Sequence, residues 1–166
     1  MADPKTGPNP LFLREEELRQ AMDLLFLAQR DVSKVPDKVL ARHGLGRAHH
    51  RVIYFVGRHP GITVSELLRL LQVTKQSLSR VLSDLVAREL IAQAPGERDR
   101  RQRRLKLTEA GRALEREVTE QQRRLVATAY REAGADAVEG FRRVMLGLID
   151  ETERDRFERD RSSGPA

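Results

Sequence analysis

TVSELLRLLQVTKQSLSRVLSDLVAR, residues 63–88, is the stretch that decides the fold. Thr63 is followed three residues later by Glu66, a spacing that predicts a capping box at the start of a helix. A short turn then leads to Thr74, which can cap a second helix that runs to about residue 88. The apolar side of this second helix is formed by Leu78, Val81, Leu82 and Leu85. Two short helices at this separation, the second with polar side chains outward, indicate a helix-turn-helix.

A β-hairpin is predicted directly after the second helix. Residues 90–94 can form one strand, and a Pro-Gly turn follows at residues 95–100. Residues 101–107 alternate well enough for the return strand, with Leu105 and Leu107 on the same side. A hairpin in this position is a wing. The expected fold class is therefore mainly α with a small β-hairpin wing, a winged helix-turn-helix with further helices at both ends.

Helices are predicted on both sides of this central motif. Residues 11–35 carry apolar side chains at three- and four-residue steps, and shorter helices are expected at residues 37–42 and 47–58. After the wing, one long helix is expected over residues 108–131 and a last one over residues 136–159.

Positive charge is concentrated in the centre of the chain. The whole sequence has 31 Lys and Arg against 25 Asp and Glu, a net charge of +6, and its pI is about 10.3. Residues 40–106 alone contain 14 Lys and Arg against 5 Asp and Glu, so the remainder is mildly acidic. This separation favours a central module that binds a polyanion, flanked by segments with another role.

Composition excludes several classes of protein. The chain has no cysteine, which rules out disulfides, a thiolate nucleophile, an iron–sulfur cluster and thiol-based redox sensing. Its apolar runs are far shorter than the roughly 18 residues that suggest a membrane span, and no secretory signal is visible, so we expect a cytoplasmic protein. No Gly-rich phosphate loop, catalytic triad or pair of catalytic carboxylates is recognisable, so neither an enzyme nor a cofactor is expected.

Several stretches resemble the MarR family of bacterial winged-helix regulators. The matching stretches are DRR at 99–101 followed by LT at 107–108 (wing to helix), LVARELI at 85–91 (recognition helix to wing) and HPGITVSEL at 59–67 (approach to the helix-turn-helix). The stretch at 43–52 is similar to the PetP-like branch of that family. The resemblance covers about residues 11–157.

The resemblance implies an obligate homodimer that binds pseudo-palindromic operator DNA as a repressor. Many members of the family release DNA when a small ligand, often an anionic aromatic, fills a pocket between the dimer helices and the DNA-binding lobe. The organisation expected is a disordered arm (1–10), an N-terminal dimerisation helix (11–35), a winged helix-turn-helix lobe (36–107), C-terminal long helices that complete the dimer interface (108–159) and a flexible tail (160–166).

The second helix of the motif is the predicted recognition helix, because polar side chains lie on its outward, N-terminal side. The residues expected to contact base edges in the major groove are Gln76, Ser77 and Arg80. The residues expected to contact phosphates, which position a protein without specifying sequence, are Thr74, Lys75 and Ser79.

The predicted wing supplies the second set of contacts. The resemblance places Arg101 in the minor groove, where narrow A·T tracts concentrate negative potential. Asp99 is expected to accept hydrogen bonds from Arg101 and hold its guanidinium in a fixed pose, although the two could form only a surface ion pair. The residues expected to neutralise the DNA backbone are Arg98, Arg100, Arg103, Arg104 and Lys106.

All four histidines lie between residues 43 and 59, which raises the alternative of a metal-responsive regulator. Against a metal site, His49 and His50 are adjacent on a predicted helix and point roughly 100° apart. The other role for this region is a pocket for a small anionic or aromatic effector, with candidate residues Arg47, His50, Arg51 and Tyr54. A DNA-binding architectural protein without sequence preference is a further alternative, which the outward Gln76, Ser77 and Arg80 argue against.

Overall fold

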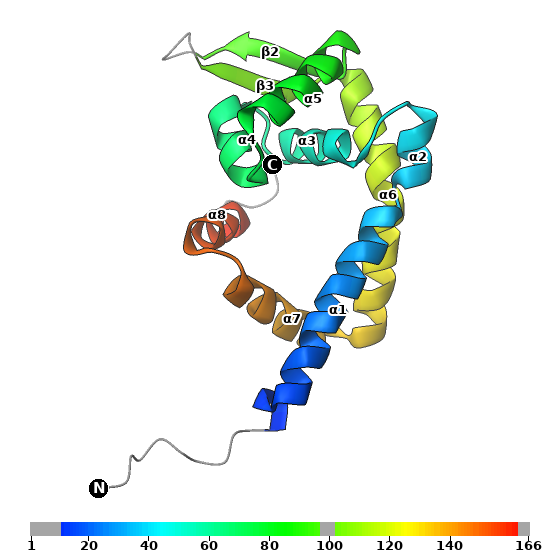
Figure 1. Ribbon diagram of the computed structural model, residues 1–166, viewed down its shortest axis with the longest axis vertical. Helices are drawn as coiled ribbons and strands as arrows, with labels where there is room; N and C mark the ends of the chain where they lie inside the picture. The colour runs from blue at the N-terminus through cyan, green and yellow to red at the C-terminus, as the bar shows by residue number, and fades with distance from the viewer. Residues whose placement is uncertain (1–10, 97–101, 163–166) are drawn as a thin grey trace, which may run out of the picture.

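The computed structural model describes residues 11–96 and 102–162 and consists mainly of helices (Figure 1). Its elements, in chain order, are η1 (Leu11–Leu13, a 3-10 turn), α1 (Glu15–Lys34), α2 (Asp37–Arg42), α3 (Arg47–Arg58), β1 (Ile62–Thr63), α4 (Val64–Leu71), α5 (Lys75–Ala87), β2 (Ile91–Pro95), β3 (Arg103–Leu107), α6 (Glu109–Ala133), α7 (Ala135–Leu148) and α8 (Glu151–Ser162). No helix in these two ranges is long and apolar enough to cross a membrane.

The helix-turn-helix begins where its caps predict. The Thr63 hydroxyl accepts a hydrogen bond from the Glu66 backbone N–H at 3.2 Å, and the Glu66 carboxylate accepts one from the Thr63 N–H at 2.8 Å. This reciprocal pair satisfies two donors that have no partner within α4. At the start of α5, the Thr74 hydroxyl accepts from the Ser77 backbone N–H at 3.2 Å. Both predicted helix starts are therefore confirmed.

The wing belongs to a sheet of three strands rather than to a hairpin of two. β3 lies in the centre and pairs antiparallel with β2 on one side and β1 on the other. β1 is only two residues long, with Ile62 opposite Leu105, and was not predicted. The Gly61 backbone N–H also donates to the Leu105 carbonyl at 2.8 Å. The third strand therefore anchors the base of the wing to the residues that precede α4.

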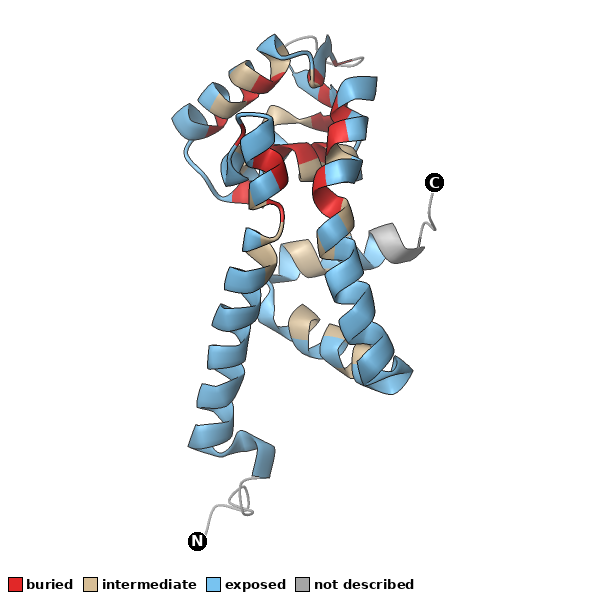
Figure 2. Cartoon of the chain, turned by 90° about the vertical axis from the view of Figure 1, so that its right-hand side faces the viewer, coloured by how far each residue is buried: buried red, intermediate tan, exposed pale blue. Residues whose placement is uncertain are grey.

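One hydrophobic core lies in the winged-helix lobe, which we define as residues 37–96 and 102–118 (Figure 2). Its most deeply buried members come from every helix and strand of that lobe, among them Leu40, Ile53, Val56, Leu67, Leu78, Leu85, Ile91, Leu105 and Val118. On α6 the core ends at Val118, which the buried Thr119 follows, and further along the same helix Gln121 and Leu125 are exposed. Neither α1 nor α7 contains a buried residue.

The C-terminal segment forms two helices, so the prediction of one helix over residues 136–159 was wrong. Ile149 has an extended backbone conformation (ψ 157°) and ends α7. The Asp150 carboxylate then accepts a hydrogen bond from the Glu153 backbone N–H at 3.0 Å. An acidic N-cap of this kind begins a new helix, which is α8.

Candidate nucleic-acid interface

The outward side of α5 carries a row of exposed polar and cationic side chains. Together they line one shallow depression: Lys75, Gln76, Ser79, Arg80 and Ser83. The opposite side of α5 packs into the core through Leu78, Leu82 and Leu85, which fixes the direction of the outward set. Lys75 and Arg80 form no ion pair with any residue in the described ranges, so both cations are available to an external anion.

Ser77 differs from the other predicted base-contacting residues. Its hydroxyl accepts a hydrogen bond from the Thr74 hydroxyl at 2.9 Å, while its backbone N–H donates to the same Thr74 oxygen. Ser77 also lines a small hollow between α3 and the start of α5, and it is absent from the outward depression. It therefore belongs to the cap of α5, whereas Gln76 and Arg80 share the outward surface.

The wing adds positive charge beside α5. Arg103, Arg104 and Lys106 are exposed on β3, and Arg104 Nη1 donates to the Gly61 carbonyl at 3.2 Å. That bond directs one of the three cations back toward β1. The predicted contacts at Arg98, Asp99, Arg100 and Arg101 lie outside the described residues.

A cavity of about 610 Å³ lies between α1, α3 and α6. Its walls include His50, Arg51 and Tyr54 from α3, three of the four residues predicted for an effector pocket. The remaining lining residues were not predicted: Val32, Phe55, Thr119, Gln122, Arg123, Val126, Ala127 and Tyr130. Gln122, Val126 and Tyr130 are spaced at four-residue steps, which places them on one side of α6. This spacing was the signal in the sequence that could have indicated a shared site.

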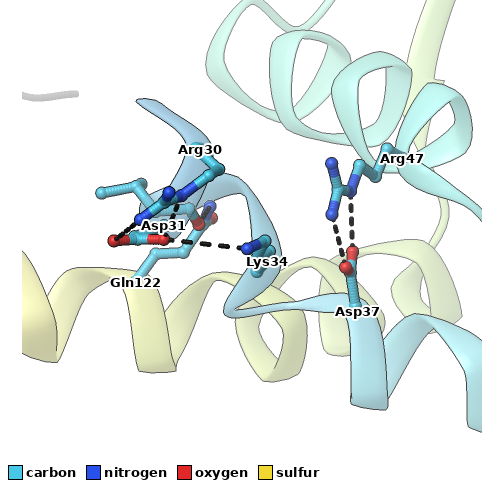
Figure 3. Close-up of polar contacts among 7 residues, drawn as sticks. Arg30, Asp31, Lys34, Asp37, Arg47 and Gln122 are labelled. Atoms are coloured by element: carbon cyan, nitrogen blue, oxygen red, sulfur yellow. Dashed lines mark hydrogen bonds and ion pairs between the residues drawn. The ribbon is translucent and has the colours of Figure 1, made fainter. Parts of the chain in front are cut away.

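Arg47, the fourth predicted effector residue, does not line this cavity. Its guanidinium donates to both carboxylate oxygens of Asp37, at 2.9 and 2.6 Å (Figure 3). This bidentate pair holds the pKa of Asp37 below its usual range and joins α3 to α2. Nearby, Gln122 Nε2 donates to the Val32 carbonyl at 2.9 Å and joins α6 to the end of α1.

His50 presents a buried nitrogen beside the cavity. Its Nε2 has no hydrogen-bond partner, and burial lowers the pKa of the imidazole against the opposing effects of Glu115 and Asp37. The ring packs edge-on to Tyr54, with centroids 6.4 Å apart, and Tyr54 packs edge-on to Phe55. The cavity therefore offers a neutral imidazole and two aromatic rings, which suit a flat apolar ligand with one hydrogen-bonding group.

Two other histidines pair with carboxylates from distant helices. His43 Nε2 lies 3.2 Å from Glu117 of α6, and His49 Nε2 lies 3.0 Å from Asp84 of α5. Within residues 11–96 and 102–162, no three His, Asp or Glu side chains converge as a metal site would require. These contacts instead join the helices that surround the core.

The arrangement of helices α3 to α5 and the sheet defines a winged helix-turn-helix protein. Residues 43–102 match the model of the MarR family. The chain is 46% identical over 152 residues to the HTH-type transcriptional regulator PetP of Rhodobacter capsulatus, which covers 92% of each sequence. This chain therefore belongs to the MarR family of transcriptional regulators, which are not enzymes, and the family resemblance in its sequence is confirmed.

Solved structures show the same fold. A MarR family transcription regulator superposes with a TM-score of 0.68 at 21% identity, over 90% of this chain and 95% of its own. A MarR mutant from E. coli, in complex with operator DNA, gives a TM-score of 0.62 at 21% identity, over 85% of this chain and 99% of its own.

Proposed function

We propose that this chain is a cytoplasmic, homodimeric repressor that binds a pseudo-palindromic operator and releases it when a small ligand occupies the cavity between α1, α3 and α6. The observation that carries the DNA-binding part is the outward surface of α5, where Gln76 and Arg80 lie beside unpaired cations on the helix and the wing. A surface that bound phosphates alone would need only cations, whereas amide and guanidinium groups also suit base edges.

In this proposal α5 lies in the major groove. Gln76 and Arg80 contact bases, and Lys75, Ser79 and the cap residue Thr74 contact phosphates. Ser77 stabilises the start of the helix, and the proposed base contacts are made by Gln76 and Arg80. From the wing, Arg101 enters the minor groove with Asp99 orienting it, and the DNA backbone is neutralised by Arg98, Arg100, Arg103 and Lys106.

The homodimer is supported by apolar side chains that remain exposed in the single chain. On α1, Leu18, Met22 and Leu25 fall on one side of the helix and are 40–56% exposed. On α6 and α7 the exposed set is Leu125, Phe141, Val144 and Leu148. Exposed apolar side chains gathered on one side of a helix mark an interface, and a second copy of the same helices would bury them.

The DNA-binding proposal is tested by selecting an operator from randomised duplexes with the full-length protein. Affinity for that operator and for a scrambled duplex is then measured for wild type, Arg80→Ala and Arg116→Ala. Arg80→Ala should weaken operator binding by about 1–3 kcal/mol per site and reduce the preference over the scrambled duplex. Arg116 is an exposed arginine on α6 outside the depression on α5, and its variant should match wild type. An equal affinity of the wild type for both duplexes would instead identify an architectural DNA-binding protein.

A further inference from the structure

Arg51 lies between the large cavity and the start of α5. It lines the cavity of about 610 Å³ and also a second, small hollow of about 50 Å³. The other residues of that hollow are Ala48, Val52, Leu71, Val73, Ser77, Leu78 and Val81. Since Ser77 belongs to the first turn of α5, Arg51 lies between the proposed ligand site and the beginning of the proposed recognition helix.

The guanidinium of Arg51 has no partner among the described residues. It is exposed, and it forms neither a hydrogen bond nor an ion pair in those ranges. Arg47, one turn earlier on the same helix, is by contrast fixed by both oxygens of Asp37. An arginine remains charged at any physiological pH, so Arg51 is a free cation on a flexible stem.

The small hollow adjoins a place where an anion is favoured. The first turn of α5 has backbone N–H groups without partners inside the helix, and this turn contains no acidic residue that would repel an anion. In the proposed complex this helix end approaches a phosphate, as the helix N-terminus does in many nucleic-acid contacts. Arg51, beside Ser77, is positioned to strengthen that contact.

Arg51 could also bind an anion in the large cavity, which it lines as well. His50 supplies no positive charge there, because burial keeps its imidazole neutral. Arg123, the other arginine in the lining, lies 3.6 Å from the Glu120 carboxylate, which also accepts a hydrogen bond from Arg124 at 2.8 Å. Among the described lining residues, Arg51 is therefore the cation without a carboxylate partner, and it remains available to a negatively charged ligand group.

We propose that Arg51 is shared between two mutually exclusive anions, a DNA phosphate beside the start of α5 and the carboxylate of an aromatic ligand in the large cavity. This inference rests on the proposed function and specifies how ligand binding lowers DNA affinity. An aromatic carboxylate draws Arg51 toward the cavity and removes one phosphate contact from each protomer. An uncharged aromatic of the same shape fills the cavity and leaves Arg51 on the DNA.

The DNA part of the inference is tested through the salt dependence of operator binding. Arg51→Met keeps the apolar stem and removes the charge, and Arg116→Met is the matched control on α6. One phosphate contact fewer per protomer should reduce the slope of log K against log salt by about two for the dimer. Arg51→Lys should restore part of that slope, and Arg116→Met should leave it unchanged. An unchanged slope in Arg51→Met overturns the inference.

The ligand part is tested with 2-naphthoate and its uncharged analogue 2-naphthamide, whose own fluorescence anisotropy reports occupancy without DNA. In wild type and Arg116→Met, both probes should bind, but only the carboxylate should weaken operator affinity, by at least fivefold. In Arg51→Met, neither should weaken it. The inference is overturned by the absence of 2-naphthoate binding at millimolar concentration, by equal release with the amide, or by release from Arg51→Met. If the wild type shows no preference for the operator, the proposed function fails together with this inference. If the wild type prefers the operator, any of the three contrary results above removes only the proposed role of Arg51.

Discussion

Gly111, in the first turn of α6, lies so close to the backbone carbonyl of Leu90 that the space between them cannot hold a Cβ atom. Hydrogen bonds from Thr108 join the same two segments. The Thr108 hydroxyl donates to the Glu89 carbonyl at 2.6 Å and accepts from the Gly111 N–H at 3.0 Å, and the Thr108 N–H donates to the Leu90 carbonyl. The turn that follows α5 and the start of α6 are therefore joined through their backbones.

Replacing Gly111 with alanine should destabilise the protein, because the obstacle is backbone and cannot rotate away. Overpacking of this kind costs about 1–3 kcal/mol, which should lower the Tm by roughly 2–12 °C. Gly140→Ala in α7 is the matched control, since nothing lies within 4 Å of the added methyl group. That variant should gain about 0.5–1 kcal/mol from helix propensity. Thermal unfolding followed by circular dichroism measures both, and equal Tm values would contradict the close packing of Gly111.

The capping box at Glu66 should make part of the stability acid-sensitive. The hydrogen bond from the Thr63 N–H holds the pKa of the Glu66 carboxyl below its usual range. A carboxylate with a lowered pKa stabilises the fold above its unfolded value of about 4.3 and loses that effect as the pH falls through the folded value. Glu66→Gln keeps the shape without the charge. Urea midpoints of the two proteins should differ most at neutral pH and converge below pH 4; a constant gap would argue against this origin.

His50 should make the protein less stable in mild acid. Its buried imidazole has a lowered pKa, so the unfolded chain takes up a proton first as the pH falls through about 6.5. Stability is therefore unaffected by this group at pH 8 and declines as the pH falls below about 7. Comparing the Tm of wild type with that of His50→Gln across this range isolates the effect, because the other histidines are common to both. We expect the variant to gain relative to wild type on acidification, and the opposite trend would refute the assignment.

Dimerisation should depend on one side of α1. Met22 lies with Leu18 and Leu25 on the apolar side, whereas Leu27 projects among polar residues on the other, although both are exposed in the single chain. Burying a methionine contributes about 1.5–3 kcal/mol, so Met22→Glu should raise the dimer dissociation constant at least about tenfold. Leu27→Glu should not. Analytical ultracentrifugation over a dilution series distinguishes them, and two equally stable dimers would place the interface elsewhere.

Features set by neighbouring residues were predictable from the sequence. The caps at Thr63 and Thr74 and the leucine spacing of α5 depend only on positions three or four residues apart, and each is present in the structure. The acidic N-cap at Asp150 was equally local, and it was overlooked because the apolar pattern continues across Ile149.

Features that depend on distant segments were not predictable. β1 is too short to show alternation, and it exists because Ile62 pairs with Leu105 more than forty residues later. Arg47 and Arg51 have the same chemistry and lie one turn apart, yet only Arg47 has Asp37 within reach. The cavity draws its walls from α1, α3 and α6, so no single stretch of sequence contains its outline.

The backbone junction at Gly111 also makes α6 a lever. Its 25 residues form a rod about 38 Å long, which packs against Leu90 at the base of the wing at one end and leads into Gly134 (φ 83°) and α7 at the other. At that length, a tilt of about 5° displaces the opposite end by about 3 Å. In the proposed dimer, small changes in how two copies meet near α7 would therefore be magnified into changes in the spacing of the two copies of α5.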